Sequence, residues 1–222
     1  MTLYDGAVDL ASPNNSRTRI VGRIPVGSRV LEVGCATGFM AEHLTRARGC
    51  LVTGVEQDPD AARVAAGRCA RLVVGDVENP ALLARCAGEY DVIVFADVLE
   101  HLRDPATVLR ALAGYLAPGG RVLASIPNVA HWSIRWRLLV GRWEYQERGI
   151  LDRTHLRFFT RRSALRLFQQ AGLAVIGADG VWGFPRVFYP PDAVQTWLAG
   201  RLPGLFMIQF IIEAQRETSG KC

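Results

Sequence analysis

A glycine-rich turn and an acidic residue, each following a predicted strand, have residue types and a spacing that could do chemistry. The turn is Gly34–Gly38 (Gly-Cys-Ala-Thr-Gly), between an alternating apolar segment at 29–33 and a predicted helix at 39–48. Glycine lets a ligand approach the backbone, and a helix N-terminus presents free N–H groups. Glu56 ends the next predicted strand, where a carboxylate can accept both hydroxyls of a ribose. The pair predicts a nucleoside site; the alternative is an ordinary tight turn beside a solvated carboxylate.

These residues must be positioned by strands and helices that alternate along the chain. Strands are predicted at 29–33, 51–55, 72–74, 90–95, 121–126, 174–178 and 205–212. Helices are predicted at 16–24 (capped by Ser16), 39–48, 59–70, 105–116 and 162–171. This alternation with short connections predicts an α/β fold, a doubly wound and mostly parallel sheet with helices on both faces.

The 222 residues are expected to form a single domain with one interruption. Its parts are a lead-in and helix (1–28), a cofactor-binding half (29–126), a small cap insertion after the fifth strand (127–160) and the C-terminal part of the sheet (161–222). A cap is inferred because a plain loop of that length would be uncommon. Its tryptophans 132, 136 and 143 have a spacing that fits one helix face packed on the core, and a pocket wall is the alternative.

Five segments, in order and at even intervals, carry a family resemblance: Val30–Gly38, Glu56, Gly75–Val77, Asp91–Asp97 and Leu116–Gly120. At these segments the chain resembles the class I S-adenosyl-L-methionine-dependent methyltransferases, which have a Rossmann-like seven-stranded sheet. The resemblance covers nearly the whole chain. It implies S-adenosyl-L-methionine as cofactor, bound by Gly34, Cys35, Ala36, Gly38, Glu56, Gln57, Asp76, Val77 and Asp97.

The resemblance also implies a role for each part of this site. The turn passes under the methionine part, Glu56 holds the ribose, Asp76 holds the adenine amino group, and Asp97 lies beside the sulfonium. Ala36 stands where the family has glycine, and its methyl group should tighten the turn without abolishing binding. The third glycine of the dinucleotide motif is missing, with Met40 near its place, which argues against a nicotinamide cofactor.

Two further segments are similar to one subgroup of these methyltransferases. Phe95–Pro105 contains the string Leu-Glu-His-Leu-Arg-Asp-Pro, and Gly149–Thr160 ends in Asp-Arg-Thr-His-Leu-Arg-Phe-Phe-Thr. The resemblance implies O-methylation of sugars, glycan precursors or secondary metabolites, in a group related to the ubiquinone-pathway enzymes. The motif of DNA amino-methyltransferases is absent after the fourth strand, where Asp97-Val-Leu-Glu stands.

Methyl transfer to a hydroxyl requires removal of a proton, and a neutral imidazole suits that step. Three histidines are candidates: His155 in the cap, which we favour, His101 after the fourth strand and His131 after the fifth. Each could instead be structural, and His43 lies within a predicted helix as a surface or packing residue. No convincing set of metal ligands is found, so no metal is expected.

The net charge of +5 comes from 26 basic residues, of which only Lys221 is a lysine. Nine arginines fall between Arg135 and Arg166. They form either a solvated helical face or a pocket rim that holds an anionic group of the acceptor. A nucleic-acid partner is disfavoured because lysine and an appended binding domain are lacking.

The five cysteines include no CxxC pair and are expected to be reduced thiols in a cytoplasmic protein. The apolar run Leu205–Ile212 is far shorter than the ~20 residues of a membrane-spanning helix. The N-terminus shows no secretory signal. A homo-oligomer stays open, because the last strand could lie inside the sheet or at a dimer edge.

The sequence therefore predicts an S-adenosyl-L-methionine-dependent enzyme of biosynthesis that methylates a hydroxyl of a small acceptor. The alternatives are N-methylation of an amino sugar or other small amine, RNA methylation, and a non-catalytic partner protein that keeps the fold.

Overall fold

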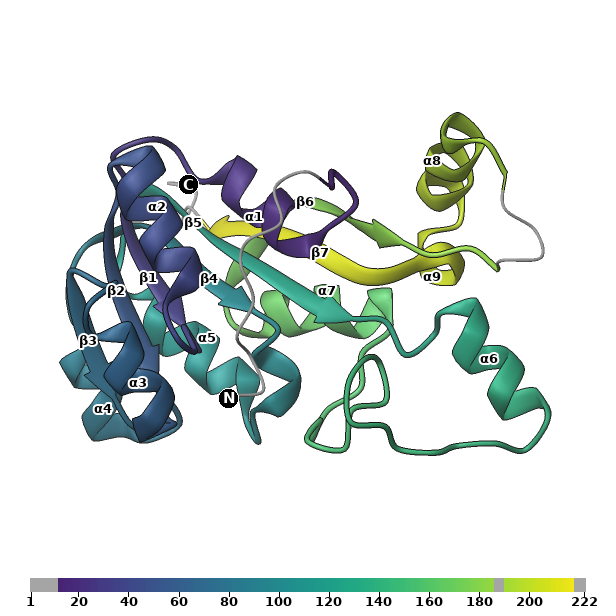
Figure 1. The fold of residues 1–222 in the computed structure, drawn as a ribbon, viewed down its shortest axis with the longest axis horizontal. Coiled ribbons are helices and arrows are strands. Elements are labelled where there is room, and N and C mark those ends of the chain that lie inside the picture. Colours follow the sequence, from purple (N-terminus) through teal and green to yellow (C-terminus); the bar gives the residue numbers. More distant parts are fainter. Residues whose placement is uncertain (1–11, 186–189, 218–222) are drawn as a thin grey trace, which may run out of the picture.

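The computed structural model describes residues 12–185 and 190–217, which build one seven-stranded sheet in the order β3-β2-β1-β4-β5-β7-β6 (Figure 1). The strands are β1 (Arg29–Val33), β2 (Leu51–Glu56), β3 (Arg71–Val74), β4 (Tyr90–Ala96), β5 (Leu116–Pro127), β6 (Leu173–Trp182) and β7 (Met207–Arg216). Strands β1 to β5 run parallel, and β7 runs antiparallel to both β5 and β6. The predicted mostly parallel α/β sheet is confirmed.

Five of the described helices begin after an Asn, Asp or Thr residue whose side chain accepts a free N–H group of the first turn. The described helices are α1 (Ser16–Arg23), α2 (Phe39–Arg48), α3 (Pro59–Ala65), α4 (Pro80–Arg85), the 3₁₀ turn η1 (Leu99–His101), α5 (Pro105–Ala113), α6 (Trp132–Leu139), α7 (Arg161–Gln170), α8 (Asp192–Arg201) and α9 (Pro203–Phe206). Asn15, not Ser16, caps α1. Helix α3 stops at Ala65, five residues before the predicted end, because Gly67 lies in the turns that follow.

Alternating side chains of the strands build a core on each face of the sheet. In β4, Val92 and Val94 pack with α1 and α2, whereas Ile93 and Phe95 pack with α4, α5 and α7. This two-sided cover leaves the carboxyl ends of β1 to β4 as the edge where loops can build a site. None of the described helices is both long and apolar enough to cross a membrane.

The final apolar run forms a strand inside the sheet. Its first residues belong to α9, so β7 begins at Met207 and continues through the polar end of the run to Arg216. There Glu213 accepts a hydrogen bond from Arg121 of β5 at 2.6 Å, which makes a polar residue tolerable in an inner strand. Helices α4 and α8 were not expected from the sequence.

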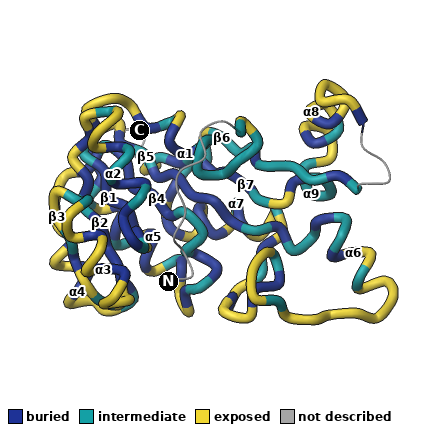
Figure 2. Tube along the Cα trace, in the orientation of Figure 1, coloured by how far each residue is buried: buried dark blue, intermediate teal, exposed yellow. Residues whose placement is uncertain are grey.

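Segment 127–160 contains the short helix α6 and a mostly exposed turn region (Figure 2). Helix α6 ends at Leu139, before Trp143, and the Trp136 side chain is 61% exposed. The expectation that the three tryptophans form one helix face packed on the core is therefore wrong. The run of residues after Leu139 cannot continue the helix because Gly141 adopts a left-handed conformation at φ 73°.

Candidate functional site

A cavity of about 690 Å³ lies at the carboxyl ends of β1, β2, β3 and β4. Its volume is within the range of small-molecule sites in proteins. Eight of the nine residues predicted to bind the cofactor line it: Gly34, Cys35, Ala36, Glu56, Gln57, Asp76, Val77 and Asp97. Gly38 lies outside the lining, at the start of α2. The sequence thus brings one set of strand-end residues to one cavity, because parallel strands end at the same edge.

The glycine turn depends on backbone conformations that side chains rarely adopt. Gly34 has φ +70°, and a Cβ there would lie 2.6 Å from Val98 Cγ2. Gly38 has φ +76°, and a Cβ there would lie 3.1 Å from the Ala65 Cα atom. Ala36 is itself left-handed at φ 49°, a conformation that an L side chain adopts only under strain. Strain of this kind is concentrated at binding sites.

Glu56 joins the turn to the end of β2. Its Oε2 accepts a hydrogen bond from the Ala36 backbone N–H at 2.7 Å, and its Oε1 accepts one from Asp58 N–H at 2.9 Å. The side chain is only 8% exposed. A carboxylate has about four acceptor positions, so two remain for the hydroxyls of a ribose.

Further acidic side chains line the cavity, together with two arginines from outside the sheet, Arg17 and Arg103. Asp97 follows β4 with φ 58°, and its Oδ1 accepts hydrogen bonds from Ser125 Oγ at 2.7 Å and from the Gln209 amide. Burial raises the pKa values of Asp97 and of Glu32 in β1. Arg17 of α1 lies over the Phe39 ring, 4.5 Å from its centre, and also lines the cavity. Sequence reasoning missed Arg17, because only the packing of α1 on α2 brings it there.

His101 is the one candidate base that lines the cavity. Its Nδ1 lies 3.2 Å from the carbonyl oxygen of Thr154, which can only accept a hydrogen bond. The Thr154 hydroxyl, 3.3 Å from the same Nδ1, donates its hydrogen to Asp152 at 2.7 Å, so Nδ1 is assigned the ring hydrogen and Nε2 the lone pair. The resulting tautomer is the one that a general base needs.

His155 lies behind His101 and is only 9% exposed. The two ring centres are 4.8 Å apart, and the His155 Nδ1 contacts the carbonyl oxygen of Ile150 at 3.2 Å. Its Nε2 lies 3.9 Å from Oε1 of Glu100. Burial lowers the pKa of His155. The residue favoured from the sequence is thus placed in a second layer, not in the cavity lining.

Glu100 is the buried centre of this group. The side chain is 1% exposed, and neither carboxylate oxygen has a hydrogen-bond partner among the described residues. Its carbonyl oxygen accepts the N–H groups of Leu156 and Arg157, both at 2.9 Å, so it fastens segment 127–160 to the loop after β4. Burial, with the nearby negative charge of Asp97, raises the pKa of Glu100 well above its usual value.

This raised pKa gives a prediction for stability. Above the ordinary glutamate pKa of about 4.3, the unfolded chain loses a proton that the folded chain keeps, so stability falls as pH rises. Glutamine does not titrate, so Glu100→Gln should not lose stability in this way. We expect the free energy of unfolding of the variant, relative to that of the unmutated chain, to rise by at least about 1 kcal/mol from pH 5 to pH 8. Urea unfolding at both pH values measures it. Glu144→Gln, an exposed carboxylate in the same segment, is the control; equal pH dependence of all three proteins would contradict the prediction.

His131 does not line the cavity. His131 caps α6, and its Nε2 lies 3.0 Å from the carbonyl oxygen of Gly183, so it ties α6 to the end of β6.

The arginines from Arg135 to Arg166, all of them described, do not line the cavity. Several bind within their own segment, as Arg153 does with Glu147. Of the two alternatives for the cluster, a pocket rim is not formed at this cavity; Arg17 and Arg103 are the arginines that line it.

Comparisons with known proteins show the family of this chain. A family model described as a methyltransferase domain matches residues 11–178. A ubiquinone biosynthesis O-methyltransferase of Aeromonas salmonicida is 32% identical over 193 residues, which are 83% of this chain and 76% of that protein. Two other relatives of the same name match over 45% and 54% of their length.

Two solved structures show the same fold. A SAM-dependent methyltransferase of Archaeoglobus fulgidus has a TM-score of 0.65 at 16% identity, covering 91% of this chain and 95% of that one. A magnesium protoporphyrin IX methyltransferase of Synechocystis, solved with bound SAH, has a TM-score of 0.61 at 17% identity, covering 92% and 83%.

The residues that line the cavity fit S-adenosyl-L-methionine. The Gly34–Ala36 backbone leaves an open cradle that a Cβ at Gly34 would close, and Glu56 keeps acceptor positions for ribose hydroxyls. The acidic side chains of Glu56 and Asp97 suit the positive charge of a sulfonium. The chain belongs to the methyltransferase-domain family and is a class I S-adenosyl-L-methionine-dependent methyltransferase.

Proposed function

We propose that this chain methylates a hydroxyl oxygen of a small, ring-bearing acceptor, with His101 as the general base. The observation that carries the proposal is the contact of His101 Nδ1 with the Thr154 carbonyl oxygen, which leaves the lone pair on Nε2 of this cavity-lining residue. Oxygen as the methylated atom is supported by the relatives, which are named O-methyltransferases of ubiquinone biosynthesis.

The proposed roles of the other residues follow from their positions. Gly34 to Ala36, Glu56, Gln57, Asp76 and Val77 hold the cofactor, and Arg17 binds its carboxylate. When bound, the cofactor supplies an electrophilic methyl group on a good leaving group. His101 takes the hydroxyl proton on Nε2, and the Thr154 carbonyl then accepts a hydrogen bond from the charged ring. Proton removal by a positioned group typically contributes 10²–10⁴ in rate.

Aromatic side chains of segment 127–160, of which Phe158 contacts His155 and none lines the cavity, support a ring-bearing acceptor. The Phe158 ring lies 5.3 Å from that of Trp143, 6.4 Å from that of Tyr145 and 6.2 Å from that of His155. Thr154 and Leu156, which line the cavity, come from the same stretch of chain. Aromatic faces bind both phenolic rings and the apolar faces of sugars, so a phenolic and a sugar acceptor are the two classes to compare.

Methyl-labelled cofactor offered with a phenol, a sugar and a primary amine tests the proposal. We expect label on the oxygen of the phenolic or the sugar acceptor. An amine attacks through its own lone pair and needs no base once it is neutral. Transfer to the amine alone would overturn the proposal in favour of N-methylation.

A further inference from the structure

Two cysteines from separate parts of the sequence meet above one glycine in the sheet. Cys35 belongs to the glycine turn after β1, and Cys69 precedes β3. Gly54 lies between them in β2, where it pairs with Glu32 of β1 and Leu72 of β3. A Cβ on Gly54 would lie 2.8 Å from the sulfur of Cys35 and 2.8 Å from that of Cys69. Glycine at this position therefore leaves room for a pair of thiols.

The two sulfurs each lie 2.8 Å from the same point above Gly54, and the two thiols differ in exposure. The Cys35 thiol donates to the Ala36 carbonyl oxygen at 3.9 Å. The neighbouring Cys69 and burial raise the pKa of Cys35, and the neighbouring Cys35 lowers the pKa of Cys69. Cys35 is 1% exposed, whereas Cys69 is half-buried and within reach of a small reagent. An accessible thiol with a lowered pKa next to a second thiol is the arrangement of cysteines that respond to oxidants.

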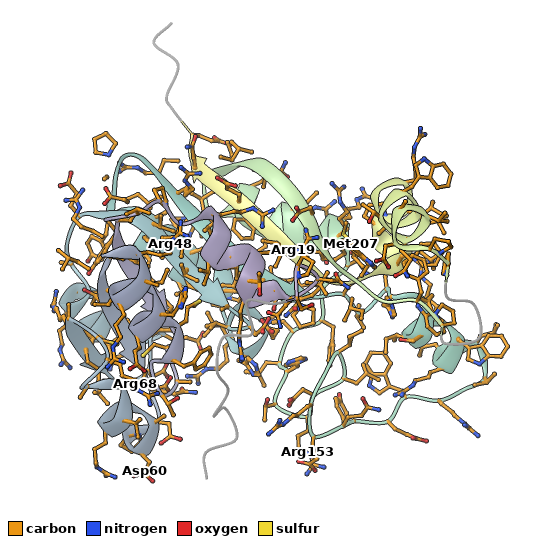
Figure 3. The ribbon with its side chains drawn as sticks, turned by 45° about the horizontal axis from the view of Figure 1, so that its top comes forward. Arg19, Arg48, Asp60, Arg68, Arg153 and Met207 are labelled. Atoms are coloured by element: carbon orange, nitrogen blue, oxygen red, sulfur yellow. The ribbon has the colours of Figure 1, made fainter. Side chains whose placement is uncertain are left out.

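The surrounding chain holds the pair together. Arg68, labelled in Figure 3, is the residue before Cys69. It donates to the carbonyl oxygen of Thr37 in the turn at 3.0 Å and pairs with Glu42 of α2 at 3.1 Å. A Cβ on Gly38 would lie 3.2 Å from the Arg68 Cβ, so the two segments pack closely. The sulfurs are thus held near each other by contacts that do not involve them.

We infer that Cys35 and Cys69 are a redox-active dithiol, which a hydroperoxide converts to a disulfide across the cofactor turn. The Cys69 thiolate attacks one oxygen of hydrogen peroxide, the O–O bond breaks, and the sulfur becomes a sulfenic acid as hydroxide leaves. The Cys35 sulfur then attacks that of Cys69, the S–O bond breaks, and water leaves. In total, two thiols lose two electrons and two protons, and one peroxide becomes two waters.

This bond should weaken cofactor binding. A disulfide brings the sulfurs to about 2.05 Å, so Cys35 must move from its place in the reduced turn. The Cys35 N–H donates to Val55 carbonyl oxygen at 3.0 Å, and the next N–H donates to Glu56 at 2.7 Å, so the movement disturbs the cradle. By thermodynamic reciprocity, bound S-adenosylhomocysteine should oppose disulfide formation. Only this consequence depends on the cofactor site; formation of the bond does not.

The test uses the full chain with Cys222→Ser, which removes a thiol outside the described residues. After treatment with hydrogen peroxide and alkylation of free thiols, mass spectrometry of the digest should find one peptide pair linked through Cys35 and Cys69, two hydrogens lighter and released by dithiothreitol. The link should persist in Cys86→Ser, which removes a buried thiol elsewhere, and disappear in Cys69→Ser and Cys35→Ala. Absence of the link at peroxide doses that oxidise Cys69, or no reaction of Cys69 at all, overturns the inference.

Calorimetric titration with S-adenosylhomocysteine then measures the consequence. We expect the oxidised protein to bind at least about tenfold more weakly than the reduced one, with recovery after dithiothreitol, and no change in Cys69→Ser under the same treatment. Equal affinity of the linked and reduced forms overturns the proposed effect on the cofactor site. If the reduced protein does not bind S-adenosylhomocysteine at all, the cofactor assignment is contradicted instead. The dithiol is then tested by the mass spectrometry of the linked peptides alone.

Discussion

Replacing His101 by alanine is expected to lower kcat for methyl transfer to a hydroxyl by about 10²–10⁴. The reason is that the acceptor must lose its proton as the new carbon–oxygen bond forms, and His101 is the cavity-lining imidazole with a free lone pair. Affinity for S-adenosylhomocysteine should stay within about threefold, because the turn and Glu56 are untouched. Steady-state kinetics with a phenolic acceptor and calorimetry on the same preparations measure both quantities.

The pH profile separates a base from a residue that only supports the loop. A phenol ionises near pH 10 without help, so the defect of His101→Ala should shrink steadily as pH rises toward that value. His43→Ala is the matched control, since His43 lies in α2 outside the cavity lining. A defect in His101→Ala that is constant across pH, or one matched by His43→Ala, would contradict the assignment.

The cofactor half of this site could be predicted from the sequence because its residues sit at fixed places in a repeating pattern. In a parallel sheet every strand ends at the same edge, so residues that follow β1, β2, β3 and β4 converge without knowledge of any side-chain contact. Gly34, Glu56, Asp76 and Asp97 are each such residues, and all four line the cavity.

The remaining residues depend on how separate segments pack, which no local pattern specifies. Arg17 lies in α1, before the first strand, and reaches the cavity only through its contact with Phe39. The sequence favours His155 over His101 as the base, yet Glu100 binds the backbone of segment 127–160 and His155 lies in the second layer. The meeting of Cys35 with Cys69 likewise needs a glycine at position 54, which composition alone does not single out.

The predicted boundaries of the last strand were wrong for a related reason. The apolar run 205–212 predicts a strand, but Pro203 begins a short helix that takes up its first two residues. The strand then gains polar residues at its other end, because Glu213 meets Arg121 from β5. Periodicity indicates which residues tend to be buried. It does not show that Glu213 can lie in an inner strand, because its ion pair with Arg121 is a tertiary contact.

Glu56→Ala is expected to reduce affinity for S-adenosylhomocysteine by roughly 100-fold. The substitution removes two charge-assisted hydrogen bonds, to the N–H groups of Ala36 and Asp58, together with acceptors for the ribose. Such bonds contribute about 1.5–3 kcal/mol each, and 100-fold in affinity corresponds to about 2.7 kcal/mol. Calorimetry measures the change, with Glu89→Gln as control, because that exposed carboxylate pairs with Arg29 outside the cavity lining.

A second ligand shows whether Glu56 binds the ribose or only supports the turn. S-adenosylhomocysteine without the ribose 2′-hydroxyl should bind the unmutated chain about tenfold more weakly, because one carboxylate acceptor loses its donor. Glu56→Ala should bind S-adenosylhomocysteine and its 2′-deoxy form equally, because the contact between Glu56 and the 2′-hydroxyl is already lost. The difference between the effect of the missing hydroxyl in the unmutated chain and in the variant measures the energy of that contact. A penalty of the same size in both proteins would restrict Glu56 to holding Ala36 and Asp58, and the ribose would then be held by other groups of the lining.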